Sequence, residues 1–431
     1  MNNSTQPFFK RAQWIQHTNI YEVNLRQFSV EGTFNAFAKA LPRLAAMGVE
    51  TLWIMPIHPI GKVNRKGTLG SYYSISNFMA VNPEFGTADD FKNLIELAHS
   101  SGMKVIMDWI ANHAAWDNVW TKDHPEYFVR DEEGNFKPPY DWTDVIQIDH
   151  TNATQQDAMI NAMKYWVTNF DIDGFRADLA HLTPLEFWQK ARAVIEPLKD
   201  NLFWLAESEE INYHQVFDAT FTWEWMHSTE DFYKHNHNIN SLYTVLEKYN
   251  HNFPKDAYRM YFTSNHDENS WNGTEYEKYA EMALPLAVFS CTWNGIPMIY
   301  SGQELPNLKR LKFFDKDEIE WNGENKLHDF YKTLFSLHKK NNALSACDTS
   351  VKTFIIKTGA PEKIMAYLRK APNAEVLVLL NLSDEETGFI LHDELIDGDF
   401  TDVFDNIIKK IITGSFIRLN AWGYKVFERS W

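Results

Sequence analysis

Cysteine, positive charge and long apolar runs are scarce in this sequence of 431 residues. Two cysteines, Cys291 and Cys347, are too few for a disulfide framework, which makes a reducing compartment compatible with the chain. Acidic residues outnumber basic ones by 58 to 41, giving a net charge of -17. We therefore expect no nucleic-acid partner and no anionic membrane surface as a partner, because both recruit patches of Lys and Arg.

The sequence shows no sign of membrane insertion or secretion. It contains no uncharged apolar run long enough to span a bilayer, and its first residues, MNNSTQPFFKRAQW, lack the apolar segment of a signal peptide. This predicts a cytoplasmic protein; a secreted or periplasmic location would require that a signal had been removed.

Aromatic residues are abundant: 16 Trp, 18 Tyr and 30 Phe. Most must belong to a large core, but some of the tryptophans fall in polar stretches, where a flat apolar ring can stack on a sugar. The length exceeds that of a single hydrophobic core, so we expect one large domain and one or two smaller ones.

Short β-branched or aromatic runs alternate with helix-like stretches between about residues 20 and 300, a pattern typical of a parallel sheet. Eight runs predict a (β/α)8 barrel in the α/β class. An open doubly wound sheet is the alternative, but no Gly-rich phosphate loop follows the first run. The predicted strands are 20–25, 51–57, 104–110, 173–179, 202–208, 218–223, 259–265 and 297–303.

Two segments depart from the βα pattern. Residues 114–150, rich in Trp, Asp and Pro, are too long for a simple loop, and we interpret them as a small lobe inserted after the third strand. Residues 349–431 contain strand-like runs without long helices between them, which predicts an antiparallel β domain. The barrel would then comprise residues 1–113 and 151–348.

Ionisable residues gather where four of the predicted strands end, and active sites of barrels lie at these ends. A single Asp at a strand end is more often a helix cap than a catalyst, but convergence of four strand ends on one face is hard to explain as capping. The residues are Asp108 and His113 after the third strand, Arg176 and Asp178 on the fourth, Glu207 on the fifth, and Asn265, His266 and Asp267 on the seventh.

These residue types suit hydrolysis of a glycosidic bond with retention, which needs a carboxylate nucleophile and a carboxylic acid about 5 Å apart. Arg176 and Asp178 share a face of their strand, so the guanidinium would favour an ionised nucleophile. Glu207 follows apolar neighbours and suits the general acid. Asp267 would oppose the positive charge of the transition state. Metal-dependent hydrolysis is a weaker alternative, since H-x-H and HExxH spacings are absent near the strand ends.

Four motifs in order resemble those of the α-amylase family of glycoside hydrolases: DWIANH (108–113), GFRADLAH (174–181), LAESEE (205–210) and FTSNHDENSW (262–271). EFGTADDF (84–91) and GIPMIYSGQE (295–304) are also similar to family segments. The resemblance implies the same barrel, inserted lobe and C-terminal β domain. It also implies Asp178 as nucleophile, Glu207 as acid/base and Asp267 as stabiliser of the transition state.

The resemblance further implies a sugar subsite on the nonreducing side of the cleaved bond. Tyr73 would be its stacking platform, and we place Asp108 in the same site. The subsite would be lined by Tyr73, His113, Arg176 and His266. Trp116 and Trp142 in the inserted lobe, like Trp120, are either sugar platforms or the core of the lobe.

The chain departs from the family pattern at two places. His181 and Leu182 stand where Lys-His is common, so contacts beyond the cleaved bond are expected to differ, with His181 as a candidate substrate contact. Asn112 matches a common calcium ligand, but Gln147 stands where another ligand is often Asp. Both a calcium-binding and a metal-free form are open, and the chemistry itself requires no cofactor.

The predicted activity is hydrolysis of α-1,4-glucosidic bonds in starch-type glucans or maltooligosaccharides. A transglycosylase or glucosyl isomerase would use the same covalent intermediate with a sugar as acceptor. A non-catalytic, amylase-like binding protein is the third alternative, but such proteins lose catalytic residues, and all three carboxylates are present here.

Overall fold

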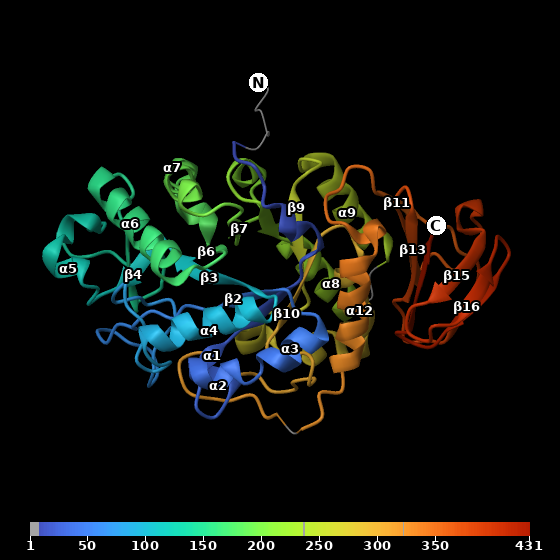
Figure 1. The fold of residues 1–431 in the computed structure, drawn as a ribbon, viewed down its shortest axis with the longest axis horizontal. Coiled ribbons are helices and arrows are strands. Elements are labelled where there is room, and N and C mark those ends of the chain that lie inside the picture. The colour runs from blue at the N-terminus through green and yellow to red at the C-terminus, as the bar shows by residue number, and fades with distance from the viewer. Residues whose placement is uncertain (1–7, 236–237, 322) are drawn as a thin grey trace.

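The computed structural model describes residues 8–235, 238–321 and 323–431. Its centre is a closed barrel of eight parallel strands in the order β1-β10-β9-β8-β7-β6-β3-β2 (Figure 1). The predicted (β/α)8 barrel is therefore confirmed, and each predicted strand overlaps one of the observed ones. The strands are β1 (Ile20–Val23), β2 (Thr51–Ile54), β3 (Lys104–Ile110), β6 (Gly174–Asp178), β7 (Phe203–Ala206), β8 (Ala219–Phe221), β9 (Tyr258–Tyr261) and β10 (Ile296–Tyr300).

Helices surround the barrel and connect its strands. The helix-like stretch at 33–48 is divided into two helices, because Pro42 has no amide hydrogen and is tolerated only in the first turn of a new helix. Gly48 ends the second of them at φ 92°. The main helices are α2 (Phe34–Ala38), α3 (Leu41–Met47), α4 (Ala88–Ser100), α6 (Ala153–Phe170), α7 (Leu185–Ile195), α8 (Trp223–His235), α9 (Asn240–Asn252), α11 (Ala283–Thr292) and α12 (His328–Lys340).

The barrel interior is apolar at its base and charged at its C-terminal end. Ile106 and Leu205 belong to one buried cluster inside the barrel. Side chains two residues apart on a strand share a face, so Asp108 and Glu207 lie above these two residues on the same inner face. The fold thus places the charged residues over a closed apolar floor.

The inserted lobe and the C-terminal domain lie at opposite ends of the molecule in Figure 1. In the lobe, β4 (His113–Ala115) pairs with β5 (Val145–Gln147), and α5 (Trp120–Asp123) lies between them in sequence. None of the helices in the described ranges has the length and apolarity needed to cross a membrane.

The C-terminal antiparallel β domain is confirmed. Its main sheet has the order β11-β12-β13-β18-β15-β16, and β14 pairs with β17 in a second, two-stranded sheet. Leu377, Leu379, Phe400 and Phe427 are among the buried residues of its own core. The strands are β11 (Lys352–Ile355), β12 (Ile364–Lys370), β13 (Ala374–Asn381), β14 (Thr387–Ile390), β15 (Gly398–Asp402), β16 (Ile408–Ile411), β17 (Phe416–Leu419) and β18 (Tyr424–Ser430).

Candidate active site

One buried guanidinium joins three carboxylates at the C-terminal end of the barrel. Nη1 of Arg176 lies 2.9 Å from Asp108 Oδ1 and 2.9 Å from Asp178 Oδ1. Its Nη2 lies 2.7 Å from Glu207 Oε2. Arg176 is fully buried, and its guanidinium carbon lies 4.7 Å from the centroid of the Trp53 ring. This arrangement brings Asp178 and Glu207, from neighbouring strands, to the same point.

The backbone after Asp178 also contributes to the site. Leu179 has φ 40° and ψ 50°, a left-handed conformation that is costly for a leucine. In this conformation its amide donates a hydrogen bond of 2.8 Å to Glu207 Oε2. The turn that ends β6 therefore holds the carboxylate of β7 in place.

A second group of side chains surrounds the loop after β9. Nε2 of His266 lies 2.7 Å from the hydroxyl of Tyr73 and 3.3 Å from Asp267 Oδ2. The Tyr73 and His266 rings are stacked, with centroids 5.3 Å apart. The hydroxyl of Tyr73 also donates to Asp108 Oδ2 at 3.1 Å. Asp108 thereby connects the group around Arg176 to the group around His266.

Burial dominates the protonation of Asp178. It raises the pKa of Asp178 well above the ordinary value; Arg176 lowers it, and the Glu207 and Asp108 carboxylates raise it further. Arg176 therefore favours the ionised form, as the sequence predicts, but its charge is divided among three carboxylates and does not outweigh burial.

The pKa values of Asp267 and His113 are both lowered, which keeps Asp267 charged and His113 neutral. Burial disfavours the charge on Asp267, but His266 and then Arg176 hold its pKa below the ordinary value. Burial lowers the pKa of His113 to about 4, although Asp144 opposes the shift.

The three candidate catalytic carboxylates line one cavity of about 460 Å³. Its walls also contain Tyr73, His113 and Trp142, which the sequence places in the substrate site. Asp108, Arg176 and His266 lie behind this wall, because they are almost completely buried and do not line the cavity. Further lining residues are Lys66, Ser71, Asp144, Val145, Leu179, Trp271, Phe313 and Phe314.

A second cavity of about 550 Å³ adjoins the first at Glu207. His181 lines it, and its role as a substrate contact stays a prediction. Glu207 and Leu179 border both cavities. The other lining residues are Ser208, Glu209, Glu210, Ile211, Asn212, Gln215 and Trp223.

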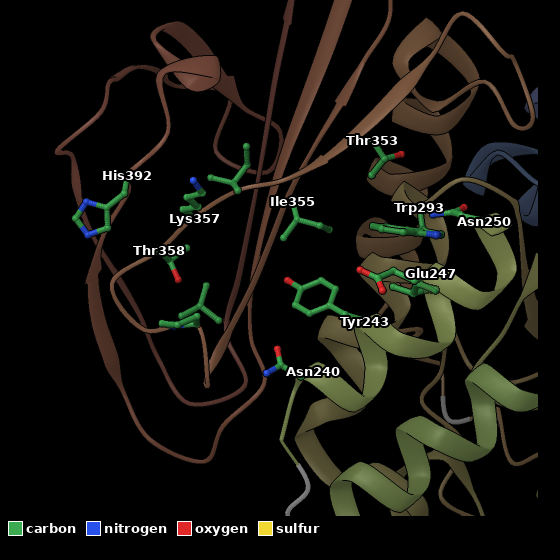
Figure 2. A pocket seen from close by; sticks show the side chains of 14 residues that line it. Asn240, Tyr243, Glu247, Asn250, Trp293, Thr353, Ile355, Lys357, Thr358 and His392 are labelled. Carbon is green, nitrogen blue, oxygen red and sulfur yellow. The ribbon is translucent and has the colours of Figure 1, made fainter.

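A larger cavity of about 670 Å³ lies far from these carboxylates, between α9 and the C-terminal domain (Figure 2). Tyr243, Trp293 and Ile355 form part of its wall, and Glu247 is the only carboxylate among the described residues that line it. Glycosidic chemistry needs two carboxyl groups, so this cavity is not a candidate for the reaction.

The tryptophans of the lobe have different surroundings. Trp142 lines the carboxylate cavity, and its ring lies 5.7 Å from that of His113. Trp120 stacks on Phe78 with centroids 4.9 Å apart. Trp116 lies outside both cavities, and its indole donates to the Thr143 carbonyl at 3.0 Å. Trp116 thus packs within the lobe, whereas Trp120 packs against Phe78 of the segment after β2.

Sequence reasoning missed Glu22, Trp53 and Leu179. Glu22 is the penultimate residue of β1, and Trp53 on β2 donates to Asp108 Oδ2 at 3.1 Å. The signal in the sequence is that Glu22 is the one charged residue in the otherwise uncharged predicted strand 20–25. The sequence carries no comparable signal for the backbone conformation of Leu179.

Calcium would have to bind near Asn112, whose buried side-chain oxygen has no hydrogen-bond partner. Gln147, which pairs with His113 across the lobe sheet, supplies no charge. Within the described ranges, no group of three or more His, Cys, Asp or Glu could hold a metal ion. These donors do not fit a carboxylate-rich calcium site, and calcium binding stays a prediction.

Comparison with known proteins agrees with this geometry. A family model described as "Alpha amylase, catalytic domain" matches residues 10–149 and 130–348. The α-amylase MalA of Haloarcula japonica is 26% identical over 394 residues, which cover 87% of this chain and 56% of that protein. The α-1,4-glucan:maltose-1-phosphate maltosyltransferase of Picrophilus torridus is 27% identical over 400 residues, with coverages of 83% and 60%. The chain thus spans less than two thirds of both relatives.

Solved structures of similar length also match. The noncanonic maltogenic α-amylase AmyB from Thermotoga neapolitana has a TM-score of 0.89 and 32% identity, covering 97% of this chain and 99% of that one. An α-amylase from Lactobacillus plantarum has a TM-score of 0.87 and 27% identity, with coverages of 96% and 99%.

Proposed function

The chain belongs to the α-amylase family, and we propose that it is a retaining glycoside hydrolase that cleaves α-1,4-glucosidic bonds in starch-type glucans or maltooligosaccharides. One observation carries this proposal: Asp178, Glu207 and Asp267 line a single cavity, with the first two bound to one guanidinium. Two carboxyl groups held by adjacent nitrogens of one arginine lie close together, which favours the spacing of about 5 Å that retention requires.

In the first step, Asp178 attacks the anomeric carbon while Glu207 protonates the glycosidic oxygen. The bond between sugar and leaving group breaks, and an ester forms between Asp178 and the sugar. The productive form therefore carries a proton on Glu207 and a charge on Asp178. Asp267, whose pKa is held low, supplies a negative charge opposite the oxocarbenium-like transition state.

In the second step, Glu207 takes a proton from water as the water attacks the anomeric carbon, and Asp178 leaves as a carboxylate. The general acid touches the leaving group, so the cavity beyond Glu207 would receive the sugar that departs. The cavity that contains Tyr73, Asp178 and Asp267 would hold the sugar that forms the ester. His181 would contact the leaving side.

Product analysis tests the proposal. A time course on starch, pullulan, cyclodextrin and maltotriose is expected to show shorter α-glucans, and NMR at early times is expected to show the α-anomer as the first product. Initial formation of the β-anomer would exclude the retaining mechanism. Absence of cleavage in every substrate would exclude α-glucan hydrolysis.

Transglycosylation is a second candidate, and the cavity of about 550 Å³ beyond Glu207 supports it. A sugar held there could replace water as the acceptor of the second step. Several similar proteins are named as maltosyltransferases. Accumulation of sugars longer than the starting maltooligosaccharide would favour transfer, whereas products that are all shorter would favour hydrolysis.

A further inference from the structure

Glu22 is a buried carboxylate that the proposed reaction does not use. It lies at the C-terminal end of β1 with no solvent exposure, and it does not line the carboxylate cavity. Its Oε1 lies 2.5 Å from Nδ1 of His266. Its Oε2 is buried without a hydrogen-bond partner. A carboxylate in this position is costly unless a cation compensates its charge.

The hydrogen bonds around His266 determine where its protons lie. The Tyr73 hydroxyl has one hydrogen, which it donates to Asp108 Oδ2. With this hydrogen directed to Asp108, the hydroxyl oxygen accepts at 2.7 Å from a hydrogen on Nε2. Nδ1 faces the Glu22 carboxylate, which accepts a hydrogen. Both nitrogens are then donors, and the ring is an imidazolium.

The groups around His266 agree with this charge. Acidic residues predominate, and Arg176 is the cation among them. Asp267 and Glu22 both raise the pKa of His266 and outweigh the effect of its burial. The charged and titratable groups that face this region are Glu22 from β1, Tyr73 from the segment after β2, Asp108 from β3, Arg176 from β6, Tyr300 from β10 and the adjacent Asp267.

We propose that Glu22 is a positioning residue that holds His266 as an imidazolium and, through it, keeps Asp267 ionised. His266 Nε2 lies 3.3 Å from Asp267 Oδ2, so the charge on His266 acts directly on the residue that opposes the transition-state charge. Glu22 thus acts on the reaction through two intervening side chains. The catalytic part of this inference rests on the proposed function, but the protonation of His266 does not.

Glu22→Gln tests the role of the charge, because glutamine keeps the size of the side chain and an oxygen that can accept from Nδ1. The pKa of His266 should fall in this variant. The ratio of variant to wild-type kcat/KM should therefore decrease as pH rises through the range in which His266 of the variant loses its proton. Each unit by which the pKa falls changes the protonated-to-neutral ratio about tenfold. A purely structural defect would lower the ratio equally at every pH.

NMR of protein labelled with ¹⁵N at histidine measures the protonation directly, and the His266 signal is the one absent from a His266→Gln variant. We expect the imidazolium signal at pH 7 in the wild type and its loss at lower pH in Glu22→Gln. A neutral ring at pH 7 in the wild type would overturn the proposal, even if Glu22→Gln did not fold. An unchanged titration in a folded Glu22→Gln would overturn it too.

Glu304→Gln is the matched control. Glu304 is also fully buried, and its Oε1 lies 2.9 Å from Arg43 Nη1 and 2.7 Å from the Tyr21 hydroxyl. This variant removes a buried, ion-paired carboxylate that does not contact His266, so the titration of His266 should stay as in the wild type. If His266 titrates as expected but no α-glucan is cleaved, the proposed function fails and the role of Glu22 in protonation stands.

Discussion

At the residue scale, the proposed reaction depends on two carboxyl groups to which we assign different roles. Asp178→Asn removes the nucleophile and Glu207→Gln removes the acid, so each should reduce kcat/KM by roughly 10⁴-fold or more. Both replacements preserve side-chain size, and circular dichroism should show a folded protein. Glu132→Gln, an exposed position in the lobe, serves as control and should leave the rate unchanged. Near-normal turnover of either site variant would contradict the assigned roles.

The protonation of Asp178 predicts the acid side of the pH profile. The nucleophile must be ionised, and burial raises the pKa of Asp178 well above its ordinary value. Activity should therefore be lost as pH falls at values clearly above about 3.9, the pKa of an unperturbed aspartate. The pH dependence of kcat/KM on maltotriose measures this limb. Full activity down to pH 4 would show that Arg176 outweighs burial after all.

The sequence predicts site residues where residue type and strand-end position coincide, as at Asp178, Glu207 and Asp267. It does not predict the protonation of Asp178, because this depends on how many carboxylates share Arg176. The sequence also leaves Trp116 ambiguous, since a tryptophan in a polar segment can face either the cavity or the lobe. Only the folded lobe separates Trp116 from Trp142.

At the element scale, the barrel strands are predictable because they are short, apolar and bounded by polar residues. The boundaries of the helices are less predictable from the sequence. The stretch that contains Pro42 has continuous helical periodicity but forms two helices. Likewise, α10 (Glu275–Tyr279) ends where Ala280 adopts φ 45°, and α11 begins only at Ala283. The strands β14 and β16 are harder to predict from the sequence. In β14 every second side chain is exposed, and β16, at the edge of the main C-terminal sheet, has a single buried residue.

Asp173 connects several elements at the start of β6. Its carboxylate is 2% exposed and accepts from His99 Nε2 at 2.6 Å and from the Val105 amide at 2.9 Å. The Nζ atoms of Lys104 and Lys199 each lie 3.0 Å from Asp173 Oδ1. Burial disfavours its charge, but these partners, led by His99, hold the pKa of Asp173 well below its ordinary value.

A depressed pKa contributes stability above the unfolded-state value of about 3.9, and this contribution is lost as pH falls toward the folded-state value. Asp173→Asn should therefore lower the free energy of unfolding at pH 7 by about 2 kcal/mol, since both lysines are partly solvated. Urea denaturation should show the difference between variant and wild type narrowing below about pH 4. Asp171→Asn, at a position 70% exposed, is the control and should change stability little. An equal loss at all pH values would contradict an ionic role.

At the scale of the whole molecule, a bound calcium ion would stabilise the junction of barrel and lobe near Asn112. The donors found there do not fit such a site, so we expect EDTA to leave the melting temperature unchanged. Thermal unfolding with and without EDTA, and after addition of Ca²⁺, measures this. A lower melting temperature in EDTA that Ca²⁺ restores would show that the protein binds calcium.

The contact between the lobe and the barrel limits the carboxylate cavity. Lys66, in the segment after β2, places Nζ 2.9 Å from Asp144 Oδ1 of the lobe, and both residues line this cavity. The cavity lies on the side of Asp178 away from the proposed leaving group. We therefore expect the ion pair to restrict how far a glucan chain can extend toward its nonreducing end.

Lys66→Ala should relax this restriction with little effect on folding, because Lys66 is 39% exposed and such pairs contribute at most about 1 kcal/mol. We expect the ratio of activity on amylose to activity on maltotriose to rise, and products from maltoheptaose to become longer. Chromatography of the products measures both. Lys62→Ala, in the same segment but outside the cavity, is the control and should keep the wild-type ratio. Identical products from Lys66→Ala and wild type would show that the lobe does not determine which chains the site accepts.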